Sequence, residues 1–338
     1  MKFVVTGACG GVGSHLVPRL LSLGHEVIAI DDLSSGSWDS LHEDSNLTCI
    51  TADISQIVEL TKALKNFSFE FVFHLAAISS LPECQVDPER AFAVNLIGTV
   101  NLVELSRQQS NFKGFIFTST SAVYEGTSDY PYREDSFIHP KLIYPMSKYF
   151  SENYLKAQFS NYSFPSTILR LFNIFGDFQS LTRQSPPILN YIVRELVAGK
   201  SPVLHSDGEQ ERDFICVDDV INSLILTLDS RVHSADIFNV CRGQTLSVNQ
   251  MFQDASQVLG SQLSANYVPA QDLWKSYPEL FSGDFPLIPN AIAREVTKPS
   301  LGSNEKFFSS FGWRPTKDLA SQIGEIALRI KSRILEIS

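Results

Sequence analysis

Three glycines near the start of the chain restrict its fold more than any other feature. They have the spacing G-x-x-G-x-x-G and follow the apolar run KFVVT at residues 2–6. The run predicts a buried strand, and the apolar periodicity that follows predicts a helix over residues 11–23. A strand, a tight glycine turn and a helix N-terminus, in this order, can bring backbone N–H groups against a pyrophosphate. We therefore expect a dinucleotide to bind at Gly7, Gly10, Gly11, Val12 and Gly13.

Acidic residues follow the next predicted strand, EVIAI at residues 26–30. Asp31 and Asp32 stand where a carboxylate accepts hydrogen bonds from the adenosine ribose and repels a 2′-phosphate, which favours NAD over NADP. The alternative is a glycine loop beside two solvated aspartates. Asp53, just after another predicted strand, could cap a helix at Ser55 or reach the adenine amine, and the sequence leaves both roles open.

Strands alternate with helical patterns through the first half of the chain. Further strands are predicted at 47–51, 71–75 and 114–117, with a long helical segment at 89–109. This alternation is typical of a parallel sheet covered on both faces. We expect an α/β fold, with a doubly wound parallel Rossmann sheet and a smaller mixed α/β C-terminal substrate-binding cap.

The pattern becomes irregular and rich in Pro and Ser after about residue 170, and residues 235–240 again predict a buried strand. We therefore predict interleaved domains. Residues 1–172 would form the NAD-binding Rossmann domain, with a returning segment near 208–240. Residues 173–207 and 241–338 would form the cap.

Composition excludes several classes of partner. The formal net charge of −10 gives no general basis for binding nucleic acid or an anionic membrane. No apolar run approaches the roughly 20 residues of a membrane helix, and the N-terminus has no signal-peptide layout. The five cysteines are scattered and form no CxxC pair, which indicates reduced thiols and no metal site. We expect a soluble cytoplasmic protein.

Tyr144 and Lys148 lie four residues apart at the start of a predicted helix. That spacing puts both side chains on one helix face. A phenol has a pKa near ~10, and an ammonium group together with an oxidised nicotinamide would pull it towards neutrality. Tyr144 could then act as a general base on a hydroxyl while hydride leaves its carbon.

Together these motifs make the chain similar to the extended short-chain dehydrogenase/reductase family, and within it to the nucleotide-sugar epimerases and dehydratases. The resemblance extends over most of the chain. It rests on the glycine loop, Asp31-Asp32-Leu33-Ser34-Ser35-Gly36, Asp53-Ile54, His74-Leu75-Ala76-Ala77, Asn95, Thr120 in TSTSAVY, Tyr144-x-x-x-Lys148, Arg170-Leu171-Phe172-Asn173, Arg212-Asp213-Phe214-Ile215 and Gly312-Trp313-Arg314-Pro315.

The resemblance implies roles for individual residues. Tyr144 would be the catalytic base, Lys148 its electrostatic partner and nicotinamide-ribose ligand, and Thr120 a hydrogen-bond partner of the reacting sugar oxygen. Further cofactor residues would be Asp53, Ile54, Leu75, Ala76, Ala77 and Asn95. Substrate residues would be Ser80, Ser121, Asn173, Arg212 and Arg294, with the two arginines on phosphates.

Several of these residues also have structural interpretations. His74 is more typical of a core or cofactor-supporting histidine, and Asn95 of a helix bend. Asp213, Asp218 and Asp219 could cap the helix that begins near Val220. The resemblance also implies a homodimer formed by the helices near 89–109 and 144–161.

Ala122 separates the possible reactions. Members of the family that eliminate water carry Thr-Asp-Glu at the positions of Thr120-Ser121-Ala122, and members that decarboxylate UDP-glucuronate carry Thr-Ser-Glu. The chain lacks that carboxylate, which favours NAD-dependent epimerisation at C4 of a nucleotide sugar, such as a UDP-hexose, N-acetylhexosamine or hexuronate. The alternatives are a dehydratase, decarboxylase or reductase of the same family, or a catalytically silent NAD-binding protein. Glu125 departs from the usual V-Y-G sequence.

Overall fold

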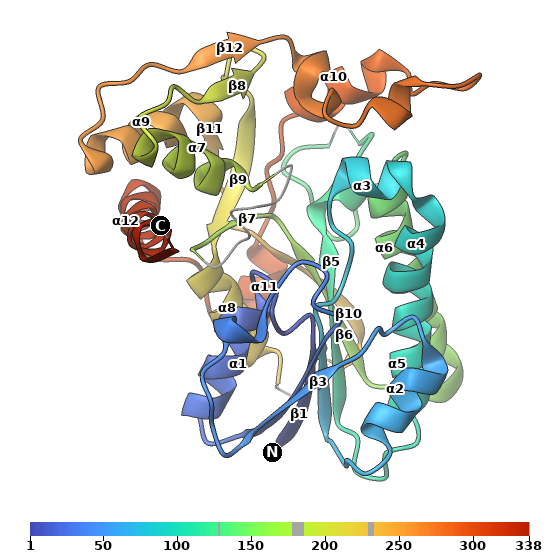
Figure 1. The fold of residues 1–338 in the computed structure, drawn as a ribbon. Helices are drawn as coiled ribbons and strands as arrows, with labels where there is room; N and C mark the ends of the chain where they lie inside the picture. The colour runs from blue at the N-terminus through green and yellow to red at the C-terminus, as the bar shows by residue number, and fades with distance from the viewer. Residues whose placement is uncertain (128, 178–185, 229–232, 338) are drawn as a thin grey trace.

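A seven-stranded parallel sheet forms the centre of the molecule (Figure 1). The computed structural model describes residues 1–127, 129–177, 186–228 and 233–337, apart from the side chains at 289, 293, 294 and 337. The strand order is β10-β6-β5-β4-β1-β2-β3. The strands are β1 (Lys2–Thr6), β2 (Glu26–Asp31), β3 (Leu47–Thr51), β4 (Phe71–His74), β5 (Gly114–Thr120), β6 (Ser166–Leu171) and β10 (Ser234–Val240). The predicted parallel sheet is therefore confirmed, and β5 extends to the hydroxyl-rich segment that the sequence placed after it.

Helices cover both faces of this sheet because its strands are apolar on both sides. In β1, Phe3 and Val5 face one core and Val4 faces the other. The first core is covered by α1 (Gly13–Ser22), α8 (Val217–Leu226) and α11 (Glu305–Phe311). The second is covered by α2 (Ile57–Leu64), α5 (Gly98–Ser106) and α6 (Ile143–Tyr162). This is the doubly wound arrangement that the sequence predicts.

The long helical segment predicted at 89–109 is interrupted. It consists of α4 (Pro88–Phe92), a π-helical turn η2 (Ala93–Ile97) and α5, and α3 (Leu81–Val86) precedes it. Inserted π turns are frequent at functional sites. Two short 3-10 turns, η1 (Trp38–Ser40) and η3 (Ser121–Tyr124), follow the ends of β2 and β5.

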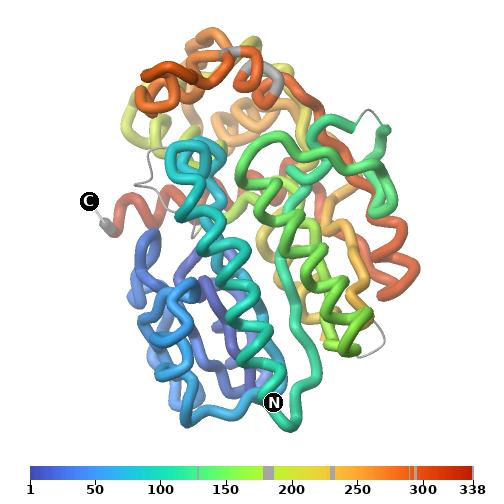
Figure 2. The backbone as a smooth tube through the Cα atoms, turned by 90° about the vertical axis from the view of Figure 1, so that its right-hand side faces the viewer, coloured from blue at the N-terminus to red at the C-terminus, as the bar shows by residue number. Residues whose placement is uncertain are grey.

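The remaining elements form a smaller unit beyond the carboxyl ends of the strands (Figures 1 and 2). A three-stranded mixed sheet has the order β11-β9-β7, and two parallel strands, β8 and β12, form another. The strands are β7 (Asn173–Phe175), β8 (Val203–His205), β9 (Glu211–Cys216), β11 (Thr245–Ser247) and β12 (Asn266–Val268). The helices are α7 (Ile188–Val197), α9 (Val248–Leu259), α10 (Pro289–Thr297), α12 (Leu319–Ile337), η5 (Ala270–Trp274) and η6 (Pro278–Phe281).

Helices α7, α9 and α12 share a separate apolar core with β8 and β9. The segment near 208–240 is divided between the two units. Its strand β9 lies in the small mixed sheet, whereas α8 packs against α1 and β10 joins the central sheet. The domain boundaries at 172–173 and 240–241 stay a prediction.

Candidate active site

One large pocket runs along the carboxyl ends of the central strands and continues towards β7, β9 and α10. Its volume is about 1620 Å³, more than a single small ligand requires, so a dinucleotide and a second nucleotide could share it. The pocket brings together most of the residues predicted from the sequence. They are Gly7, Gly10, Gly11, Val12, Gly13, Asp31, Asp32, Asp53, Ile54, Leu75, Ala76, Ala77, Thr120, Ser121, Tyr144, Lys148, Asn173 and Arg212.

The glycine turn passes very close to neighbouring backbone. Gly7 has φ +68, and a Cβ there would lie 2.7 Å from the Ala76 nitrogen. A Cβ on Gly13, at the start of α1, would lie 2.2 Å from the Gly7 oxygen. Only glycine fits at these two positions. The resulting cradle of exposed backbone at a helix N-terminus fits a pyrophosphate group.

Asp31 ties the end of β2 to the glycine turn. Its carboxylate accepts hydrogen bonds from the Cys9 N–H at 2.9 Å and the Leu33 N–H at 2.8 Å. Burial raises the pKa of Asp31, and these two donors oppose the shift. The carboxylate lines the pocket where the sequence predicts the adenosine ribose.

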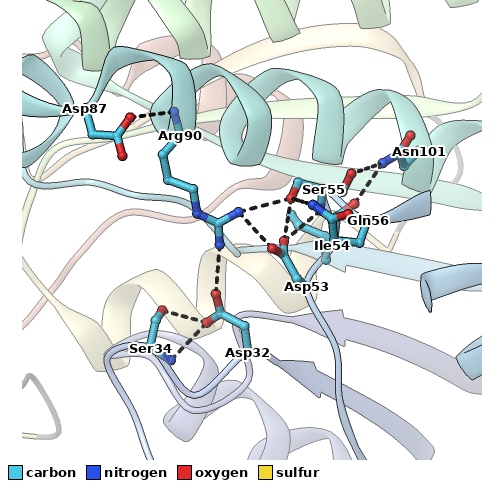
Figure 3. A network of polar contacts seen from close by, with 9 residues as sticks. All are labelled: Asp32, Ser34, Asp53, Ile54, Ser55, Gln56, Asp87, Arg90 and Asn101. Carbon is cyan, nitrogen blue, oxygen red and sulfur yellow. Dashed lines mark hydrogen bonds and ion pairs between the residues drawn. The ribbon is translucent and has the colours of Figure 1, made fainter. Parts of the chain in front are cut away.

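Asp53 is held in a local turn and in a long-range ion pair. One oxygen, Oδ1, accepts from the backbone N–H and the hydroxyl of Ser55, at 2.9 and 2.8 Å. The other oxygen, Oδ2, lies 2.7 Å from the guanidinium of Arg90 (Figure 3). Burial alone would raise the pKa of Asp53, but the bonds from Ser55 and Arg90 lower it. The sequence left two roles open for Asp53, a cap at Ser55 or a contact with adenine, and the structure contains the turn at Ser55. It also pairs Asp53 with Arg90, a residue that the sequence did not indicate.

Tyr144 and Thr120 both line the pocket and contact each other. Tyr144 lies in the first turn of α6 and is hydrogen-bonded to the Thr120 side chain at the end of β5. Burial raises the pKa of Tyr144 to about 12, and the bond with Thr120 opposes this shift. The protein's own groups thus keep the phenol protonated at neutral pH.

Lys148 lies one turn further along α6 and is 2% exposed. Its ammonium nitrogen is 4.1 Å from the centre of the Phe117 ring. Burial lowers the pKa of Lys148 from 10.5 to about 7, and the nearby Glu152 carboxylate opposes this. Lys148 is therefore poised between its charged and neutral forms near neutral pH.

The depressed pKa of Lys148 predicts a pH-dependent stability. Between about pH 7 and 10.5 Lys148 is protonated in the unfolded chain but neutral in the folded chain, so the destabilisation caused by this residue in the NAD-free protein should decrease as the pH rises. We expect wild type to gain about 1.4 kcal/mol per pH unit relative to Lys148→Met over this window. Below pH 7 the difference should be constant. Urea denaturation at pH 6, 7, 8 and 9 measures it, and parallel curves for the two proteins would contradict the assignment.

A buried ion pair lies directly behind the segment that carries Thr120. Arg170 on β6 and Glu152 on α6 are 1% and 0% exposed, and their side chains are 2.7 Å apart. Glu152 also accepts from the hydroxyl of Ser119, the neighbour of Thr120, at 2.6 Å. Arg170 donates to the Tyr124 hydroxyl at 2.8 Å. The network therefore fixes the segment Ser119–Tyr124 from behind.

Glu125 has a clear role in the structure. One of its oxygens accepts hydrogen bonds from the Lys141 and Leu142 N–H groups, at 2.9 and 3.1 Å. Leu142 is the N-cap residue of α6. Gly126, with φ +86, then turns the chain in a conformation that suits glycine. Glu125 thus fixes the start of the helix that carries Tyr144.

Two residues predicted from the sequence lie outside the pocket lining. Ser80 is the N-cap of α3, where its hydroxyl accepts from the Glu83 N–H at 3.5 Å, and the adjacent Ser79 lines the pocket instead. Asn95, fully buried in the π turn, bonds both backbone groups of Ile78 and the Ser147 hydroxyl. Its role is to hold the loop after β4.

The residues predicted to bind phosphate also form hydrogen bonds within the protein. The Arg212 guanidinium donates to the carbonyls of Glu295 and Val296 at 2.8 Å and also to that of Lys298, and so caps the end of α10. The Asn173 amide donates to the Asp213 carbonyl and the Ser300 hydroxyl, each at 3.1 Å. The Arg294 side chain lies outside the described residues.

His74 and Asp213 also had structural interpretations in the sequence, and the structure shows the contacts of both. His74 is buried between the hydroxyls of Thr6 and Thr99, at 2.8 and 2.9 Å, and burial lowers its pKa well below the ordinary value. It is a core residue. Asp213 does not cap α8, because its carboxylate accepts from the backbone N–H groups of Arg242, Gly243 and Gly302.

The Rossmann sheet, the glycine cradle and the Tyr144–Lys148 pair define a protein of the extended short-chain dehydrogenase/reductase class. A model of the NAD dependent epimerase/dehydratase family matches residues 3–241, and the chain belongs to this family. NAD is accordingly its cofactor. Within the part of the chain that the structure describes, no helix is long and apolar enough to cross a membrane.

Nucleotide-sugar epimerases are similar to the chain over nearly its whole length. The UDP-glucose 4-epimerase of Mycolicibacterium smegmatis is 30% identical over 96% of this chain and 97% of its own. The UDP-glucose 4-epimerase of Thermotoga maritima, solved with UDP-glucose, has a TM-score of 0.85 and 26% identity over 99% and 100%. The UDP-N-acetylglucosamine 4-epimerase of Methanobrevibacter ruminantium, solved with UDP-N-acetylmuramic acid, has a TM-score of 0.83 and 28% identity over 98% of both chains.

Proposed function

We propose that the protein epimerises a UDP-sugar at C4 through a transient 4-keto sugar. The observation that carries this proposal is the methyl side chain of Ala122, which lines the pocket beside Thr120 and Tyr144. Elimination and decarboxylation would need a carboxylate at that position. Glu125 also lines the pocket, but one of its oxygens, Oε2, accepts two backbone hydrogen bonds that hold the side chain at the start of α6.

The side chains present have complementary tasks in this reaction. NAD supplies the hydride acceptor, and later the donor, at C4. Tyr144 removes the proton from the sugar O4, and Thr120, to which it is bonded, shares a hydrogen bond with that oxygen. Lys148 lines the same pocket one helical turn from Tyr144, and when protonated its positive charge stabilises the phenolate of Tyr144. Because hydride leaves and returns, the reaction has no net oxidation.

The sugar is a UDP-hexose, a UDP-N-acetylhexosamine or a UDP-hexuronate. The similar proteins act on or bind the first two classes. The SSLP sequence at residues 79–82 resembles a segment of epimerases for the second and third classes. In the structure Ser79 is the serine of that segment that lines the pocket, so we assign it, in place of Ser80, to the sugar.

Product analysis tests the function directly. The protein with bound NAD is incubated separately with UDP-glucose, UDP-N-acetylglucosamine and UDP-glucuronate, and products are followed by proton NMR and mass spectrometry. We expect a product of unchanged mass with inverted configuration at C4. Loss of water or of CO₂ would instead establish a dehydratase or a decarboxylase, and NAD binding without turnover would establish a silent protein.

We also propose a homodimer formed through α6 and the continuous segment α4–η2–α5, which corresponds to the predicted residues 89–109. Ile97 and Phe150 project from the adjoining helices with 47% and 43% exposure, and Phe150 stacks on Phe92 with ring centres 6.1 Å apart. Apolar side chains grouped in this way are typical of an interface.

Charge substitutions at this face test the dimer. We expect Ile97→Glu and Phe150→Glu to produce monomers in sedimentation equilibrium, because a carboxylate buried at an apolar interface is costly. The control is Phe285→Glu, at a side chain that is 98% exposed elsewhere. A wild-type monomer, or variants that remain dimers, would contradict the proposed interface.

A further inference from the structure

Arg90 stands at the end of the pocket where the sequence predicts the adenosine half of NAD. It lies on α4, and its side chain lines the pocket together with Asp32, Asp53 and Ile54. Neither the glycine motif nor the tyrosine–lysine pair involves this residue. Its position therefore requires a separate explanation.

The Arg90 guanidinium connects the ends of two neighbouring strands (Figure 3). One nitrogen, Nη1, donates to Asp53 Oδ2 at 2.7 Å and to the Ser55 hydroxyl at 3.1 Å, beyond β3. The other nitrogen, Nη2, donates to Asp32 Oδ2 at 3.4 Å, beyond β2. The side chain thus spans the strand ends against which an adenosine would lie.

The backbone that carries Arg90 is firmly held. The Arg90 N–H donates to the carboxylate of Asp87, the N-cap of α4, at 2.9 Å. One turn later the π helix begins, and its Asn95 bonds both backbone groups of Ile78. On the opposite side Asn101 donates to the carbonyls of Ile54 and Ser55, at 2.9 and 3.2 Å. The guanidinium and its partners are therefore fixed relative to one another.

The surroundings of the Arg90 side chain suit a flat, partly polar ring. Apolar pocket walls are provided by Ile30, Ala52, Ile54, Ala77 and Val94. The carboxylate of Asp53 can accept a hydrogen bond from an amine, in addition to those it already accepts. A guanidinium group is planar and stacks readily on aromatic faces, which an ammonium group does less well.

We propose that Arg90 closes the adenine subsite, with its guanidinium lying flat against the adenine ring while Asp32 and Asp53 hold its two ends. Arg90 thereby slows the release of NAD. The inference rests on NAD as cofactor, and it gives a reason for firm retention only if the proposed epimerisation is correct. An enzyme that returns its hydride to the same sugar has no need to exchange the cofactor.

Cofactor release tests this proposal without measuring turnover. Purified protein with bound NAD is mixed with excess ADP-ribose, and the release of NAD is followed with time. We expect release to be about tenfold faster from Arg90→Ala. We expect release from Arg90→Lys to be almost as fast as from Arg90→Ala, because lysine retains the positive charge but lacks the planar guanidinium group. Arg107→Ala is the matched control, since Arg107 is similarly exposed, pairs with Glu104 and stacks on Tyr162, away from the pocket.

Binding of cofactor fragments tests which half of NAD is contacted by Arg90. We expect Arg90→Ala to weaken ADP-ribose binding about tenfold and to leave nicotinamide mononucleotide binding unchanged, with an unaltered thermal unfolding curve in the absence of ligand. If Arg90→Ala released NAD at the wild-type rate, the proposal would be overturned. An equal loss of affinity for ADP-ribose and nicotinamide mononucleotide would also overturn it. Wild-type release from Arg90→Lys would overturn the stacking contact. None of these outcomes depends on which sugar is turned over, so failure of the proposed epimerisation remains distinguishable.

Discussion

Replacing Tyr144 with Phe should reduce kcat for the sugar substrate by at least 10²-fold and up to about 10⁴-fold. The substitution removes only the hydroxyl that is bonded to Thr120, and with it the group that accepts the O4 proton. Stopped-flow or coupled assays of the epimerisation measure the loss. NAD retention should persist, because the glycine cradle and Asp31 are untouched.

Tyr149→Phe provides the matched control for this experiment. Tyr149 lies on the same helix, five residues further on, and does not line the pocket. We expect its variant to keep wild-type kcat. If both Tyr144→Phe and Tyr149→Phe retained full activity, the hydroxyl of Tyr144 would not be the base. The proposed mechanism would then be wrong.

Breaking the buried pair between Arg170 and Glu152 should cost about 3–5 kcal/mol of unfolding free energy. Arg170→Met leaves the Glu152 carboxylate without its main partner in a fully buried place, and Glu152→Met leaves the guanidinium in the same state. Urea denaturation of the two variants measures these losses. Both variants should also lower kcat, because Glu152 fixes Ser119 next to Thr120.

The double variant makes this prediction sharper. Replacing both members of the pair by Met removes both buried charges, so its loss of stability should be clearly smaller than the sum of the two single losses. The exposed pair of Lys317 and Glu325 serves for comparison, and breaking it should change the stability far less, because solvent screens the two charges. Additive losses at Arg170 and Glu152 would show that the two side chains do not stabilise each other.

The central sheet could be predicted from the sequence because its signals are local. In KFVVT and EVIAI several consecutive apolar residues are buried on both faces, as β1 and β2 confirm. The helix that carries Tyr144 and Lys148 could also be predicted, since the two residues are separated by one helical turn. The π turn at Ala93–Ile97 was missed, because its sequence resembles ordinary helix.

The roles of polar side chains were harder to predict, because their partners lie far away in the chain. Ser80 looked like a substrate ligand, but the folded chain uses its hydroxyl as the N-cap of α3. Arg212 was predicted as a phosphate ligand and does line the pocket, but nothing in the sequence indicated that its guanidinium also caps α10, more than eighty residues later. Glu125 had no explanation until the start of α6 was found beside it.

The sequence by itself determined the parallel Rossmann sheet, the glycine cradle and the position of Tyr144 in the first turn of α6, since each depends on residues within a few positions of one another. Tertiary structure alone decided that Ser79 rather than Ser80 lines the pocket, that Glu152 and Arg170 support the segment Ser119–Tyr124, and that Arg90 joins Asp32 to Asp53. A side chain's hydrogen-bond partners are set by which distant strand or helix end is packed beside it. That packing is a property of the whole fold.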